Sequence, residues 1–161
     1  MRHTEPPMPN SPSSNQAPFA PWVLPFAFGA LALAIFGAGI SIPFYSDDFQ
    51  FAFPNPGERI LYFFAHPNPV NDFYRPIQAM VMAAIQSIWG LDTRPLHFLQ
   101  ILLHGGLAYL TYALGGRLGL PLPHRVLAGL FVILSQGSTL AVLSNDTLAQ
   151  VLGTLAGVGS L

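Results

Sequence analysis

The sequence predicts an all-α integral membrane protein with three to four transmembrane helices and juxtamembrane helices on the outer face. Charged residues make up only 8% of the 161 residues, whereas about 25% is usual in soluble domains. The mean hydropathy is +0.48, and several apolar runs approach the roughly 20 residues that cross a hydrocarbon core. A formal net charge of −1 and the absence of cysteine argue against nucleic acid as a partner, disulfides and thiolate metal sites.

The N-terminal region divides into a tail and a first span. Residues 1–18 are rich in Pro, Ser and Asn, so we expect a disordered tail before a transmembrane region over residues 19–161. The apolar run over residues 22–42 is long enough to cross a bilayer, and Pro43 is suited to end it. Because the run is long for a signal peptide and no small-x-small cleavage site follows, a retained helix is the better interpretation.

The next region, residues 43–95, is predicted to be an outer loop with juxtamembrane helices. Ten of the 20 aromatic residues lie between Pro43 and Arg75, and aromatic rings favour the lipid headgroup region. A short helix is expected near Glu58–Phe64. A longer one is expected over Pro76–Trp89, because proline suits the first helical position and the following Gly90 suits a helix end.

Further spans are predicted over residues 96–116 and 126–143, and a truncated one from residue 147. Because the last run ends at Leu161, we expect the chain to be the N-terminal piece of a longer polytopic protein. If Pro76–Trp89 does not cross, the basic residues Arg117, His124 and Arg125 share the side of the N-terminus. This predicts a cytoplasmic N-terminus and an outer, periplasmic loop 43–95, and we expect the membrane to be a bacterial inner membrane.

Polar residues of the second span recur on one helical face, namely His97, Gln100, His104 and Thr111. Polar groups in a span usually hydrogen-bond to neighbouring helices, and the two histidines lie two turns apart, so we predict packing rather than a metal site. The glycine pairs at 105–106 and 115–116 predict close helix approach.

Three groups of residues could carry chemistry. Asp47 and Asp48 either cap a short helix or provide a general base whose pKa is raised by partial burial. Arg75 either extends to lipid headgroups or clamps a phosphate. Asp146 either belongs to a helix cap with Ser144 or adds an acidic group to the outer site.

Taken in order, several short motifs resemble the N-terminal region of GT-C fold glycosyltransferases, in particular the protein O-mannosyltransferase-like group. The motifs are Tyr-Ser-Asp-Asp-Phe (45–49), Phe-Tyr-Arg-Pro-Ile (73–77), Trp-Gly-Leu-Asp (89–92) and Leu-His-Phe-Leu-Gln-Ile-Leu-Leu-His (96–104). The resemblance covers about residues 22–155. It departs from the family at Ser135–Thr139, where many relatives carry a turn containing His-Pro and an acidic residue.

This resemblance implies a membrane enzyme that moves a sugar from a polyprenyl-phosphate donor to a hydroxyl acceptor on the periplasmic face. It implies that Asp47 or Asp48 is catalytic, with Asp47 the preferred base, and that Tyr74, Arg75 and Asp146 bind substrate. The expected partners are membrane lipid and the sugar donor. No cofactor is expected, and participation of a divalent metal stays open. The 161-residue piece is expected to be inactive alone.

Two other function classes fit the same sequence. One is a non-enzymatic membrane anchor or assembly subunit whose acidic pair only caps a loop. The other is a transporter or lipid-scrambling module in which the polar face of the second span lines a path. A transporter should show internal repeats with broken helices, and none is visible over this length.

Overall fold

The computed structural model describes residues 23–53, 56–70, 72–135, 143–144 and 147–161. Within these residues the chain is helical and forms no strand, which confirms the all-α class. The expected tail over residues 1–18 lies outside the described residues. The elements are α1 (Val23–Phe36), η1 (Gly37–Ser41), η2 (Ser46–Phe51), α2 (Pro56–Arg59), α3 (Tyr62–Ala65), α4 (Pro76–Trp89), α5 (Arg94–Arg117), α6 (Leu122–Leu134) and α8 (Leu148–Gly159).

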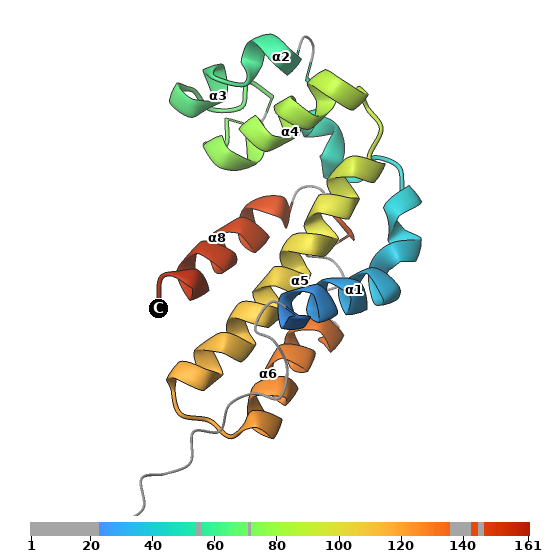
Figure 1. Cartoon of the computed structure of the whole chain (residues 1–161). Helices are drawn as coiled ribbons and strands as arrows, with labels where there is room; N and C mark the ends of the chain where they lie inside the picture. The colour runs from blue at the N-terminus through green and yellow to red at the C-terminus, as the bar shows by residue number, and fades with distance from the viewer. Residues whose placement is uncertain (1–22, 54–55, 71, 136–142, 145–146) are drawn as a thin grey trace, which may run out of the picture.

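The elements form two regions joined through α5 (Figure 1). We call residues 43–93, which contain η2, α2, α3 and α4, the head. We call α1, η1, α5, α6 and α8 the stem. The helix α4 has the range expected from sequence, with Pro76 in its first turn and Gly90 beyond its end at a φ of 62°. Only glycine adopts that conformation readily, so Gly90 suits a sharp turn into α5.

Among the described residues, two stretches are long and apolar enough to cross a membrane, namely Val23–Ser41 with 19 residues and Arg94–Arg117 with 24 residues. Length and composition alone define this property, and a signal sequence or a buried helix of a soluble protein can share it. The expected span over residues 126–143 is corrected, because α6 covers Leu122–Leu134, only 13 residues. It begins earlier than expected because Pro123 fits the first turn, and it ends earlier because Ser135 is extended, with a ψ of 127°.

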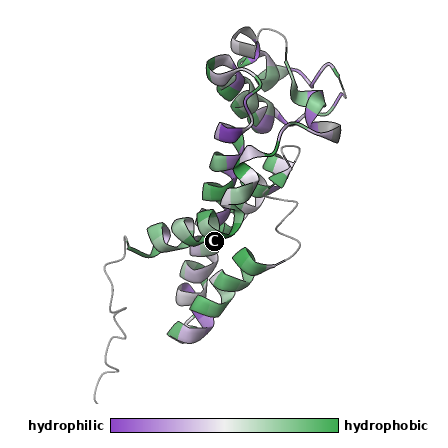
Figure 2. Cartoon of the chain, turned by 90° about the vertical axis from the view of Figure 1, so that its right-hand side faces the viewer, coloured by the Kyte–Doolittle hydropathy of each residue, from purple (hydrophilic) through white to green (hydrophobic). Residues whose placement is uncertain are grey.

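The stem is held together where α1 lies across α5 (Figure 2). A Cβ atom added at Gly105 would lie 2.8 Å from the Cα of Gly29 and 3.0 Å from the carbonyl oxygen of Phe28. A Cβ at Gly106 would meet only a Leu155 methyl at 3.8 Å. The close approach expected from this glycine pair is therefore made by Gly105, which allows two helix backbones to touch.

The head is built around an aromatic core. Phe51, Phe53 and Phe63 are buried against α4, and the ring centroids of Phe53 and Phe63 are 4.4 Å apart. Other aromatic residues of the loop, including Phe64 and Tyr74, are exposed. The loop therefore has a buried set and an exposed set of aromatic rings. The expectation that this loop places its rings at a membrane surface applies at most to the exposed set.

The polar face of α5 meets the packing prediction only in part, because His97 and Gln100 bond to non-helical backbone and Thr111 donates to the carbonyl oxygen of Leu107 in α5 itself. Thr93 donates its hydroxyl to the carbonyl oxygen of Ile42 at 2.6 Å, and Nε2 of His97 lies 3.0 Å from the same oxygen. One turn further along, the Gln100 amide donates to the carbonyl oxygen of Ser144 at 3.0 Å. These hydrogen bonds satisfy carbonyls of non-helical backbone beside α5, a role typical of polar side chains on buried helix faces.

Candidate functional site

The acidic pair lies in η2, the short 3-10 helix that follows the first candidate span. Asp48 is only 1% exposed, and its Oδ2 accepts a hydrogen bond from the Tyr45 backbone N–H at 3.3 Å. The side chain of Asp47 lies outside the described residues. Asp48 therefore takes the local capping role, with its carboxyl group buried.

A buried asparagine that the sequence analysis did not select connects this segment to the other candidate residues. Asn68 is 2% exposed and donates its side-chain amide to the carbonyl oxygen of Gln50 at 3.0 Å. Its backbone N–H donates to the carbonyl oxygen of Phe73, also at 3.0 Å. Asn68 thus holds the chain just after Asp48 against the chain just before Arg75. The only local signal for it is a position between Pro67 and Pro69, which marks a turn.

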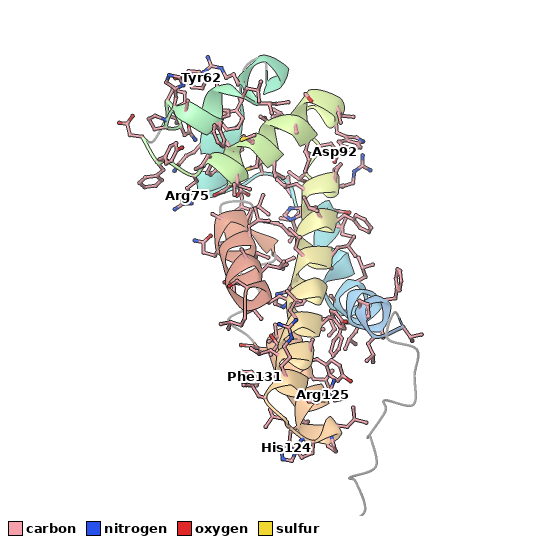
Figure 3. All side chains as sticks on the ribbon, turned by 60° about the vertical axis from the view of Figure 1, so that its left-hand side comes forward. Tyr62, Arg75, Asp92, His124, Arg125 and Phe131 are labelled. Atoms are coloured by element: carbon pink, nitrogen blue, oxygen red, sulfur yellow. The ribbon has the colours of Figure 1, made fainter. Side chains whose placement is uncertain are left out.

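Tyr74 and Arg75 lie where the chain enters α4. The Tyr74 hydroxyl donates to the carbonyl oxygen of Phe64 at 2.7 Å, so this exposed side chain ties the start of α4 to α3. The guanidinium carbon of Arg75 lies 5.1 Å from the ring centroid of Phe73. Figure 3 shows Arg75 at the end of the head that faces α8. Both side chains therefore have structural contacts, and Arg75 also places a positive charge at the edge of a groove.

The groove lies between the first turn of α4 and α8 and has a volume of about 250 Å³. Its lining is almost entirely apolar apart from the residues at one edge, and consists of Arg75, Pro76, Ile77, Gln78, Ala149, Leu152, Gly153 and Ala156. The small residues of α8 leave the space that a larger side chain would fill. The positive end of the α4 dipole adds to the charge of Arg75 at this edge. An anionic group attached to an apolar chain would match both parts of the groove.

The remaining candidates do not complete a catalytic centre within the described residues. Asp146 lies outside them, so its relation to Arg75 is not defined. Among the residues that are described, no group of three or more His, Asp or Glu could hold a metal ion. Gln86 is a second residue whose role the sequence analysis did not identify. It accepts a hydrogen bond from the Phe53 N–H at 3.1 Å and donates to the carbonyl oxygen of Phe51 at 2.6 Å.

No family model matches the chain, and comparisons with curated proteins and with solved structures gave no match either.

Proposed function

We propose that this chain is part of a membrane glycosyltransferase that moves a sugar from a polyprenyl-phosphate donor to a hydroxyl acceptor. The observation that carries the proposal is Arg75 at the edge of the apolar groove between α4 and α8. A polyprenyl phosphate combines a phosphate with a hydrocarbon chain. A planar guanidinium suits the phosphate, and an apolar groove suits the first isoprene units.

The proposed reaction assigns one step to each group. The acceptor hydroxyl oxygen attacks the anomeric carbon, and the bond from that carbon to the phosphate oxygen breaks. The phosphate leaves with the bonding electrons, and its charge is stabilised by Arg75 and the N-terminus of α4. Asp47 takes the proton of the acceptor hydroxyl. Asp48 holds the backbone beside Asp47 in place by accepting a hydrogen bond from the Tyr45 N–H.

The proposed location is a bacterial inner membrane with residues 43–95 on the periplasmic side and the N-terminus in the cytoplasm. The 24 residues of α5 extend over about 36 Å at 1.5 Å per residue, enough to cross a core of about 30 Å. Large apolar side chains are exposed on the stem, among them Phe26 and Phe131, and lipid would cover them. The three basic residues near the α5–α6 turn then face the cytoplasm.

The test is a transfer assay on membranes that contain the protein from its complete reading frame, with a radiolabelled polyprenyl-phosphate sugar as donor. Asp47→Asn should lower transfer by about 100-fold, the range for loss of a general base. Arg75→Gln should lower it by at least about tenfold, because one charge-assisted contact to phosphate is lost. Arg59→Gln and Asp92→Asn are the matched controls in the head and should keep near-normal transfer. Near-normal transfer in Asp47→Asn and Arg75→Gln would refute the proposal.

A membrane anchor or assembly subunit is the second candidate function. It is favoured by the burial of Asp48 and its hydrogen bond to Tyr45, because a carboxylate that holds local backbone needs no substrate. Under this alternative, no sugar donor supports transfer, and Asp47→Asn leaves the association of the protein with its partners unchanged.

A further inference from the structure

The turn between α5 and α6 concentrates positive charge at the end of the stem far from the head. Arg117 ends α5, and His124 and Arg125 lie in the first turn of α6. Residues 94–135 include no aspartate or glutamate. The acidic residues whose backbone the structure describes all lie in the head, at the opposite end of α5 (Figures 1 and 3).

Arg125 is held in one place by its neighbours. Its guanidinium carbon lies 4.3 Å from the ring centroid of Tyr112, a cation–π contact. A Cβ atom at Gly116 would lie 2.8 Å from the same carbon and 2.9 Å from Nη2, so the absence of a side chain there makes room for the guanidinium. Arginine normally gives up rotamer freedom when it binds an anion, and this one has given up part of it already.

The charge of Arg125 is not matched within the described residues. Its Nε is buried and has no hydrogen-bond partner there, and buried donors are normally satisfied. The surrounding surface is apolar, because Leu118, Leu120, Leu122 and Leu127 are all exposed. Exposed leucines beside unmatched basic groups are typical of a surface that enters the boundary between acyl chains and headgroups.

We propose that the α5–α6 turn is a binding site for the headgroup of an anionic phospholipid. The lipid phosphate contacts Arg125, with Arg117 and His124 beside it, while the exposed leucines contact the acyl chains. Charge complementarity selects this occupant, since the patch carries basic groups without acidic ones and its rim is hydrocarbon. The proposal does not depend on the transferase function, because the turn lies at the far end of the stem from Arg75.

The test uses the purified, delipidated protein in an uncharged detergent. Native mass spectrometry then measures the apparent affinity for phosphatidylglycerol and for phosphatidylcholine. The wild type should bind phosphatidylglycerol more tightly by about tenfold or more, and Arg125→Gln should remove most of that preference. Arg125→Lys should retain only part of it, because an ammonium cannot form the same bidentate contact. Arg94→Gln is the control, since Asp92 already pairs with this arginine at 2.7 Å.

The double variant Arg117→Gln, His124→Gln keeps the proposal testable if Arg125→Gln fails to fold, because both residues are exposed. It should lower the affinity for phosphatidylglycerol by about threefold or more and leave that for phosphatidylcholine unchanged, as expected for charges near a lipid surface. Equal affinity of the wild type for both lipids would overturn the proposal. So would an equal loss in Arg94→Gln and Arg125→Gln, or displacement of the lipid by millimolar inorganic phosphate.

Discussion

In the head, Phe51, Phe53 and Phe63 are buried in an aromatic core, whereas in the stem Phe26 and Phe131 are exposed. The backbone of the head is irregular, so polar side chains such as Gln86 and Asn68 must satisfy its amides and carbonyls. The helices of the stem satisfy their own backbone and pack through buried apolar side chains, and α1 meets α5 most closely at Gly105. The difference shows that one apolar chain can meet two packing requirements, an aromatic core around irregular backbone in the head and closely packed helices with exposed apolar side chains in the stem.

Among the variants that test this difference between head and stem, Gln86→Leu in the head is expected to change the free energy of unfolding most. The variant leaves the N–H of Phe53 and the carbonyl of Phe51 without their partner. Each buried group left unpaired costs about 1–3 kcal/mol, so the free energy of unfolding should fall by about 2–4 kcal/mol. Denaturant unfolding in detergent, followed by tryptophan fluorescence, measures the change.

The control for Gln86→Leu is Gln150→Leu on α8, where the glutamine is exposed. This variant should change the free energy of unfolding by less than about 0.5 kcal/mol. Similar losses in the two variants would mean that the head does not depend on side-chain hydrogen bonds to its loops.

A smaller effect is expected from Gly105→Ala in the stem. The added methyl group would meet the backbone of Gly29 and Phe28, so α1 and α5 must move apart, at a cost of about 1–3 kcal/mol. Gly106→Ala is the matched control one residue along. It should be neutral or stabilising by up to about 1 kcal/mol, because alanine favours helix and the site has room. Thermal unfolding of both variants in detergent measures the difference, and equal melting temperatures would contradict backbone contact between the helices.

The smallest effect is expected from Asp92→Asn at the junction of head and stem. Hydrogen bonds from Arg94 hold the pKa of Asp92 below its ordinary value of 3.8. A lowered pKa stabilises the fold above the unfolded value, and this contribution is lost as the pH falls through the folded value. The pair is exposed and screened by salt, so the wild type should exceed the variant only slightly at pH 7 and not at all below the folded pKa. Melting temperatures at pH 7 and pH 3 test this, and a large difference at pH 7 would mean that charge holds head to stem.

Much of the helix pattern could be predicted because its signals are local. The proline at the start of α4 and the glycine after its end determine its bounds, and α5 differs from the expected 96–116 by two residues at one end and one at the other. The end of α6 at Leu134 was missed, although the polar stretch Ser135–Thr139 interrupts the apolar run at that point. Hydropathy averaged over a window does not locate the residue at which a helix ends.

The candidate site was predictable only as a set of residue types. Arg75 was selected as a phosphate contact, and the structure places it at a groove that also requires α8, more than 70 residues along the chain. Asn68 could not be selected, because its partners at Gln50 and Phe73 are defined only when the loop is folded.

By itself the sequence determined the helical class, the two long apolar helices and the absence of acidic residues from positions 94–135, because these follow from composition and periodicity along the chain. Only the tertiary structure decided which aromatic rings form a core, that Gly105 and not Gly106 touches α1, and that Arg125 lies over Tyr112 and Gly116. These features depend on which faces meet. Two neighbouring residues of the same type, such as Gly105 and Gly106, face different partners, because successive positions on a helix point about 100° apart.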